Sequence, residues 1–197
     1  MVCHSLLGSA SLYTVLLRLD RDLAEEVRRK GCPRDGGALH HADFERRPRG
    51  GPGALGRRAR MRTSFCCARR ECRKRVTPPS MRFLGRRVYL GAFVVLVSAM
   101  RHGLSERRVA ELRALLGVAR STLVRWRRWW RETFAASPLF AAVRGHLAMP
   151  VDAAGLPASL LERFEGDERQ RLLAMLVMLL PLTTSSWSGK AGFSMGM

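Results

Sequence analysis

Apolar residues recur at intervals of three and four near the start of the chain, which is the spacing of an amphipathic helix. The stripe consists of Leu12, Val15, Leu16, Leu19, Leu23 and Val27. Gly31 follows the stripe and supplies a natural stop for a helix. Residues 1–31 are therefore predicted to hold one helix that packs on another element through this stripe.

The pattern changes over residues 32–85, where Gly and Pro are frequent and apolar runs are short. Only the stretches 39–44, 60–65 and 73–77 have the composition of strands. Because this segment has too few apolar residues to fold by burial alone, we predict that it needs a bound metal or a partner.

Residues 86–135 have the pattern of three helices. Residues 88–100 are apolar almost all round, which is typical of a buried helix. Ser105 is placed to cap a second helix that ends at Gly117, and a third helix is predicted over residues 120–134.

Charge is strongly segregated along the chain. The 35 Lys and Arg outnumber the 16 Asp and Glu, for a formal charge of +19. Residues 28–87 hold 19 of the cations against four acids, and residues 101–131 hold nine arginines against two acids. A bias of overall composition would spread arginine evenly, so this segregation favours a polyanionic partner, with nucleic acid ahead of membrane.

The apolar runs are too short to cross a membrane. The longest, residues 92–100 and 172–182, fall well below the roughly 20 residues that a membrane helix needs. The apolar stretch 6–19 has no Lys or Arg before it and continues into a charged helical pattern, unlike a secretion signal. Five cysteines without such a signal favour thiols and a metal site in a reducing compartment. We expect a cytoplasmic, nucleoid-associated protein.

Two cysteine motifs are spaced to share a metal ion. Cys32 precedes a tight turn with two glycines, the form of a zinc knuckle, and Cys67 and Cys72 lie about 35 residues downstream. Asp35 stands where a second knuckle cysteine would normally be, and zinc also accepts carboxylate oxygen. The predicted ligands of zinc are therefore Cys32, Asp35, Cys67 and Cys72. Alternatives for the fourth ligand are Cys66, His40 and His41, and a module that has lost its metal is the alternative to zinc binding.

Residues 105–134 have the spacing of a helix-turn-helix, in which Gly117 takes a left-handed conformation and Val118 fills the angle between the helices. Arginine can pair with guanine in two hydrogen bonds, and Ser and Thr contact bases or phosphates. The outward face of the second helix is predicted to bind DNA through Arg120, Ser121, Thr122, Arg125 and Arg128. In the basic module, Arg57, Arg58 and Arg60 are predicted to bind phosphate. The structural alternative is a three-helix bundle with a solvated arginine face.

The order of these parts resembles the zinc-ribbon plus helix-turn-helix DNA-binding portion of bacterial insertion-sequence transposases. The residues that carry the resemblance are the Cys32 knuckle, the downstream cysteines, the linking stretch from Lys74 to Leu90, and GVARSTLVRWRRWW from Gly117. The resemblance covers about residues 30–135 and implies a DNA-binding role for both parts.

Catalysis is not expected from this chain. Transposase chemistry needs three separated carboxylates that hold two metal ions. After residue 135 five acids remain, and four of them lie within residues 162–168. We therefore predict no nuclease site.

The predicted fold class is mainly α, with a small zinc-ribbon-like β module inserted between an N-terminal helix and a C-terminal helical bundle that contains the helix-turn-helix. The predicted function is non-catalytic, sequence-specific binding of duplex DNA. The alternatives are an RNA-binding or ribosome-associated zinc-ribbon protein and a truncated or degenerate transposase. The predicted parts are residues 1–31, 32–85, 86–135, a group of short helices over 136–182, and a loose tail over 183–197.

Overall fold

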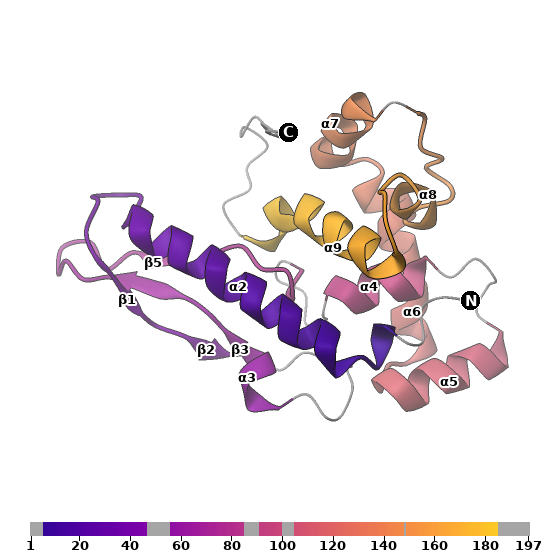
Figure 1. Cartoon of the computed structure of the whole chain (residues 1–197), viewed down its shortest axis with the longest axis horizontal. Coiled ribbons are helices and arrows are strands. Elements are labelled where there is room, and N and C mark those ends of the chain that lie inside the picture. The colour runs from indigo at the N-terminus through magenta and orange to yellow at the C-terminus, as the bar shows by residue number, and fades with distance from the viewer. Residues whose placement is uncertain (1–5, 47–55, 85–90, 100–104, 148, 185–197) are drawn as a thin grey trace.

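The computed structural model describes residues 6–46, 56–84, 91–99, 105–147 and 149–184. The fold is mainly helical and includes a small antiparallel sheet, which confirms the predicted class at this level. In Figure 1 the long helix α2 (Ala10–Lys30) runs from a cluster of helices toward a β hairpin at the opposite end of the molecule. Within the described residues, none of the helices combines the length and the apolar character that a membrane crossing requires.

Helix α2 begins and ends close to where the sequence predicts. The hydroxyl of Ser9 accepts a hydrogen bond from the N–H of Leu12, and Gly31 ends the helix at φ 74°. Near its start α2 contributes Leu12 and Leu16 to the larger of two hydrophobic cores. Near its end it contributes Ala24 to the smaller core. Helix α2 therefore links the two ends of the molecule.

The β module is built on one long hairpin. Strands β1 (Leu39–His41) and β2 (Phe44–Glu45) pair with β4 (Phe65–Cys67) and β3 (Met61–Arg62) in a single antiparallel register. The ladder is interrupted between these pairs, where the N–H of Ser64 donates to the carboxylate of Asp43 (3.0 Å). The short helix α3 (Arg57–Arg60) precedes β3, and β5 (Arg75–Val76) pairs with β4 on its other edge. Each of the three predicted stretches contains strand residues, but the strands are shorter than predicted, Arg60 belongs to α3, and β4 continues past Phe65 to Cys67.

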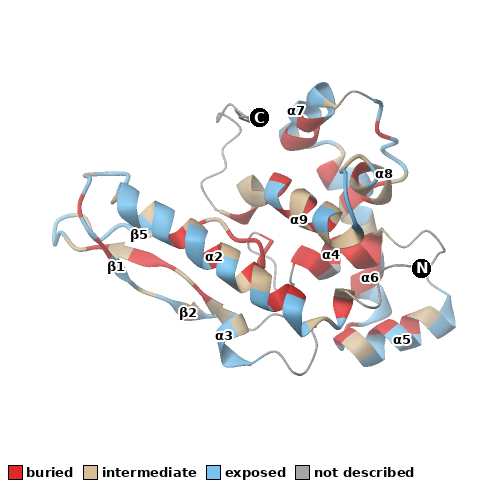
Figure 2. Cartoon of the chain, in the orientation of Figure 1, coloured by how far each residue is buried: buried red, intermediate tan, exposed pale blue. Residues whose placement is uncertain are grey.

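The larger core lies among the helices. Helix α4 (Gly91–Ser98) packs against α6 (Arg120–Arg128) and α9 (Glu168–Met178). Figure 2 shows α4 buried along most of its length, whereas α2 alternates between buried and exposed residues. The described residues also form α5 (Glu106–Leu116), α7 (Pro138–His146), α8 (Ala158–Leu161) and the 3₁₀ turn Leu180–Thr183.

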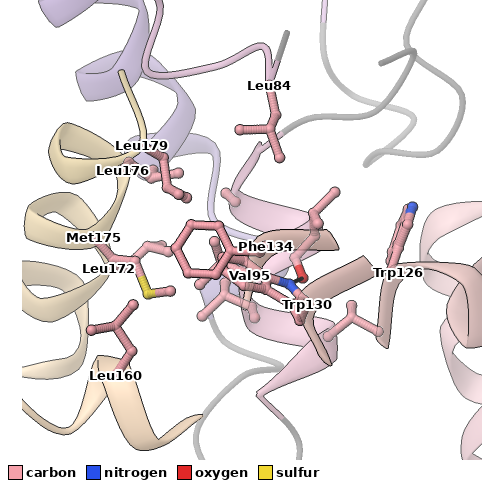
Figure 3. Packing of buried hydrophobic residues seen from close by; sticks show 14 of the residues in the cluster. Leu84, Val95, Trp126, Trp130, Phe134, Leu160, Leu172, Met175, Leu176 and Leu179 are labelled. Atoms are coloured by element: carbon pink, nitrogen blue, oxygen red, sulfur yellow. Dashed lines mark hydrogen bonds between the residues drawn. The ribbon is translucent and has the colours of Figure 1, made fainter. Parts of the chain in front are cut away.

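The predicted helix over residues 120–134 is correct in extent but changes type along its length. After α6 the chain continues as a π-helix over Trp129–Phe134. Trp130 and Phe134 are buried there with their ring centroids 4.7 Å apart, and the indole N–H of Trp130 donates to the carbonyl of Val94 (3.3 Å; Figure 3). Both aromatic side chains are part of the larger core. The outer ends of the predicted helix 88–100 and residues 185–197 of the predicted tail lie outside the described residues. The start of the tail was predicted too early, because Thr183 is buried in the 3₁₀ turn and its hydroxyl accepts a hydrogen bond from the N–H of Ser80 (3.0 Å).

A network of buried polar side chains joins α2 to the segment that follows the hairpin. The carboxylate of Asp20 accepts hydrogen bonds from the Ser80 hydroxyl and from Nε of Arg82, both at 2.7 Å. The guanidinium of Arg82 also donates to the carbonyls of Ala59 (2.7 Å) and Met61 (2.9 Å). The network therefore fixes the position of α3 and β3 against α2. No pattern in the sequence predicts these contacts.

Candidate metal centre and basic helix face

The first half of the candidate metal centre is a tight turn between α2 and β1. The N–H of Cys32 donates to the carbonyl of Gly37 (2.9 Å), and the N–H of Gly36 donates to the carbonyl of Cys32 (2.8 Å). A Cβ atom at Gly37 would lie 3.0 Å from Sγ of Cys67 and 3.1 Å from a carboxylate oxygen of Asp35. A side chain at position 37 would therefore crowd the candidate ligands.

The second half is the turn between β4 and β5. Cys67 ends β4, and its N–H donates to the carbonyl of Lys74 (2.9 Å). Between these two residues, the N–H groups of Cys72 and Arg73 both donate to the carbonyl of Arg69, at 3.1 and 3.0 Å. Arg73 has a φ of 44°, in the left-handed region. This turn brings Cys72 back beside Cys67.

Together the two turns gather the four predicted ligands Cys32, Asp35, Cys67 and Cys72. One ligand atom from each residue lies within 4.8 Å of all the others. The Sγ atoms of Cys32 and Cys72 are 3.7 Å apart, and Sγ of Cys67 lies 3.4 Å from Oδ1 of Asp35. Cys32 and Cys67 are buried, whereas Asp35 and Cys72 are half-buried. These residues are close enough to hold a metal ion.

The pKa values of Asp35 and Cys67 are shifted in opposite directions, the first by hydrogen bonds and the second by burial. The N–H of Gly37 donates to Asp35 (2.9 Å) and, with smaller contributions from the three thiols, lowers the pKa of Asp35 to about 2. Burial raises the pKa of the Cys67 thiol to about 12. Because a metal binds the thiolate, metal binding must release the proton of Cys67 and is therefore favoured by higher pH.

The alternative fourth ligands lie outside this group. Cys66 precedes Cys67 on β4, so its side chain faces the other side of the sheet, where its thiol donates to the carbonyl of Arg73 (3.4 Å). His40 is paired with Cys66 across the ladder, and both His40 and His41 are exposed. Among the described residues, the group with metal-ligand spacing is the predicted set with Asp35.

The second candidate site is the pair of helices α5 and α6. The hydroxyl of Ser105 caps α5 by accepting from the N–H of Arg108 (3.4 Å). Gly117 ends α5 at φ 65° and ψ 24°, and its N–H donates to the carbonyl of Arg113 (2.8 Å). The left-handed turn and the boundaries of both helices agree with the sequence-based expectation. Val118 is buried at this junction, as expected, together with Leu116, Leu123 and Trp126.

The outward face of α6 differs from the prediction at one position. Arg120, Ser121, Arg125 and Arg128 are exposed, as expected. Thr122 is buried, so the prediction that it faces a partner is wrong. Thr122 lies one position before the core residue Leu123, on the side of the helix that turns toward the protein. Its hydroxyl accepts a hydrogen bond from the guanidinium of Arg125 (3.2 Å).

The arginines of this face have different partners. Arg120 is paired with Glu106 of α5, and Arg128 is paired with Glu132 one helical turn further on (2.7 Å). Arg125 instead donates to the neutral hydroxyl of Thr122. Exposed ion pairs contribute little free energy and are readily exchanged for another anion. All three guanidinium groups are therefore accessible to a polyanion, and the hydrogen bond to Thr122 holds the one on Arg125 in place.

The arginines predicted to bind phosphate form the helix α3. Arg57, Arg58 and Arg60 are all exposed. The buried side chain of Arg82 stabilises this short helix by donating to the carbonyls of Arg58 (3.4 Å) and Ala59 (2.7 Å). The cations of α3 are thus carried on a backbone that is fixed to the buried network.

Two of the acids considered for catalysis bond to the backbone of their own segments. The carboxylate of Asp167 caps α9 by accepting from the N–H of Gln170 (2.8 Å). The carboxylate of Asp152 accepts from the N–H of Ala154 (2.9 Å). Hydrogen bonds of this kind are typical of helix N-caps and of turns.

Comparison with known proteins identifies no relative of this chain. The chain matches no protein-family model, no curated protein and no solved structure.

Proposed function

We propose that the protein binds duplex DNA sequence-specifically and without catalysis, through a helix-turn-helix formed by α5 and α6 and through a zinc-ribbon-like module. The observation that carries the proposal is the exposed face of α6, where Arg125 stands between Ser121 and Arg128. A helix that follows a short turn and presents such residues fits the major groove. The resemblance to transposase DNA-binding regions points in the same direction.

The charge around the two helices supports a polyanionic partner. Nine arginines lie between residues 101 and 131, against two acids. The three arginines of α3 offer a second set of cations that can bind phosphate irrespective of sequence. In this proposal α6 reads the bases, and α3 binds the backbone of the same duplex.

The spacing of the candidate ligands supports zinc as the metal. Tetrahedral zinc with Zn–S bonds of about 2.3 Å and Zn–O bonds of about 2.0 Å separates two sulfurs by about 3.8 Å, and a sulfur from an oxygen by about 3.5 Å. The observed separations are 3.7 Å between Cys32 and Cys72, and 3.4 Å between Cys67 and Asp35. Three thiolates and one carboxylate are donors that zinc accepts.

The zinc has a structural role in this proposal. The smaller core contains five buried apolar residues, and two of them are the candidate ligands Cys32 and Cys67. The others are Ala24, Leu39 and Phe65, which bury too little apolar surface to stabilise the hairpin without help. Asp35→Cys would complete a Cys-x-x-C knuckle, and we expect it to slow the loss of zinc to a chelator, whereas Asp35→Asn should speed it.

The test of DNA binding is selection from a library of randomised duplexes with the full, zinc-loaded chain. The expected result is a preferred sequence that contains a guanine. Arg125→Ala should weaken binding to it by about 1–3 kcal/mol and relax the preference at that guanine. Arg144→Ala on α7 is the matched control, because this arginine is exposed but lies outside α6. Selection of no preferred sequence, or equal effects of the two substitutions, would contradict the proposal.

RNA is the second candidate partner, because cations also surround the metal turns. The exposed residues there are Arg34, Arg69, Arg70, Arg73, Lys74 and Arg75. Single-stranded and structured RNA is bound by small basic modules of this kind. Tighter binding of a structured RNA than of the selected duplex at equal salt, with dependence on these cations and not on Arg125, would favour RNA.

A further inference from the structure

Val124 is an apolar side chain in the middle of the polar face of α6. It is 49% exposed, and the residues beside it on this face, Ser121, Arg125 and Arg128, are also exposed. Positions 121, 124, 125 and 128 share one side of an α-helix, because residues three and four apart are neighbours there. Val124 therefore lies on the exposed side of α6 together with Ser121 and Arg128, and it directly precedes Arg125, the arginine that is proposed to read the bases.

Neither packing nor helix propensity accounts for valine at this position. Val124 is not part of either hydrophobic core, unlike its neighbours Leu123 and Trp126. A β-branched residue also has a lower helix propensity than the arginines around it, because its χ1 rotation is restricted. In the described part of the chain, large apolar side chains this exposed are few, namely Val124, Met149 and Val177.

The chemistry of the face limits what can lie against Val124. The partner must carry negative charge to accompany Arg125 and Arg128, and an apolar group within reach of the same helix turn. Duplex DNA has both in the major groove, where the 5-methyl group of thymine is exposed beside the edges of the neighbouring bases. A guanine in the adjacent base pair presents the two acceptors that suit arginine.

We infer that Val124 contacts the 5-methyl group of a thymine in the base pair next to the guanine read by Arg125. This inference rests on the proposed function and deepens it, because it assigns the class of base step that α6 recognises. Thr122 contributes to the same arrangement, because its hydroxyl accepts a hydrogen bond from the guanidinium of Arg125 (3.2 Å).

The test replaces each thymine of the selected duplex in turn by deoxyuridine, which lacks only the methyl group. At one thymine beside the guanine, binding by the unaltered chain should weaken about fourfold, the effect of burying one methyl group. Val124→Ala should weaken binding to the thymine duplex by a similar factor and should then be insensitive to the deoxyuridine. The full zinc-loaded chain is used throughout.

Val177→Ala is the matched control, because Val177 on α9 is also 49% exposed. It should bind like the unaltered chain and keep the deoxyuridine effect. The inference is overturned if no thymine next to the guanine responds to loss of its methyl group, or if Val124→Ala keeps the response. Arg125-dependent binding without a methyl effect would overturn this inference alone, whereas a lack of Arg125-dependent binding would overturn the proposed function as well.

Discussion

Asp20 and Arg82, which are 62 residues apart, form an ion pair of 2.7 Å in which both side chains are almost completely buried, at 3% and 2% exposure. Asp20 belongs to α2, and Arg82 donates to the carbonyls that end α3. Removing one member of a buried pair leaves the other charge without compensation, which is much more costly than losing an exposed pair.

Asp20→Asn is therefore expected to lower the free energy of unfolding by about 3–5 kcal/mol. The measurement is urea unfolding of the zinc-loaded chain, followed by circular dichroism. Glu111→Gln is the control, because it breaks the exposed pair with Arg107 and should cost less than about 1 kcal/mol. Similar costs for the two variants would show that the buried pair does not stabilise the fold as described.

The buried pair also shows where reasoning from the sequence stops. The apolar spacing of α2, the cap at Ser105 and the turn at Gly117 are local features, and the structure agrees with them. Asp20 lies four residues after Leu16, on the inner side of α2, and its position there was a signal that it is buried. Its partner could not be named, because contacts between residues so far apart depend on the whole fold.

The candidate metal centre was predictable because cysteine spacing and glycine turns are recorded in the sequence. The proximity of Asp35, rather than Cys66 or the histidines, to the other three residues follows only from the strand register, which turns Cys66 away from the group. Thr122 was misplaced for a related reason. The polar pattern of α6 predicts an exposed side, but the width of that side depends on how α4 packs against the helix.

Cys67→Ser is expected to abolish stable zinc binding, because it removes a buried ligand of the group. Metal analysis of protein purified without chelator should give about one zinc per chain for the unaltered protein and for Cys66→Ser. Cys66 is a close control, because it is adjacent to Cys67 but its side chain lies on the opposite face of β4. Loss of zinc from both variants, or from neither, would contradict the assignment of ligands.

Removal of zinc should unfold one end of the molecule and leave the other. Amide hydrogen exchange over residues 32–76 should accelerate after treatment with a strong chelator. The fluorescence of Trp126 and Trp130 should change little, because both are buried in the larger core. A uniform acceleration of exchange over both cores would instead indicate that the hairpin and the helices unfold as one unit.

Tyr13 gives a prediction for alkaline pH. It is buried in the larger core, where its hydroxyl donates to the carbonyl of Leu7 (3.2 Å), and burial raises the pKa of Tyr13 above its ordinary value of about 10. The folded state therefore keeps the proton at a pH where the unfolded chain loses it. The stability that this contributes is complete below pH 10 and decreases as the pH rises above that value.

Tyr13→Phe should accordingly have a free energy of unfolding that falls less steeply between pH 9 and 11 than that of the unaltered chain. At pH 7 the variant should lose about 1 kcal/mol, because the hydrogen bond to Leu7 is gone. Urea unfolding at several pH values measures both effects. Parallel pH profiles for the two chains would show that the tyrosine does not contribute to alkaline unfolding.

Arg58→Ala tests the proposed role of α3 in binding phosphate. We expect it to weaken binding to all duplexes by a similar factor, because phosphate contacts carry no sequence information. If about six phosphates are neutralised, log K should fall with log salt with a slope near −5, and the variant should reduce that slope by about one. Affinity that does not depend on salt, or a change of sequence preference in Arg58→Ala, would contradict this role.

Thr122→Val tests how α6 holds Arg125, the arginine that is proposed to read the bases. Valine has nearly the shape of threonine but cannot accept the hydrogen bond from Arg125. Thr122 is buried next to the core, and valine places a methyl group of similar size where the hydroxyl was. The free energy of unfolding should therefore stay within about 1 kcal/mol of the original value. Without its hydrogen bond the guanidinium samples more rotamers, and it loses more conformational entropy on binding DNA.

The expected result is weaker binding to the selected duplex by about threefold to tenfold, concentrated at the guanine read by Arg125. Thr122→Ser, which keeps the hydroxyl, should bind like the unaltered chain, and in Arg125→Ala the change to valine should have no further effect. This double substitution separates positioning from packing, because a packing defect in Thr122→Val would persist without the arginine. Fluorescence anisotropy titrations with the five chains measure these differences, and an additive loss in the double variant would show that Thr122 acts independently of Arg125.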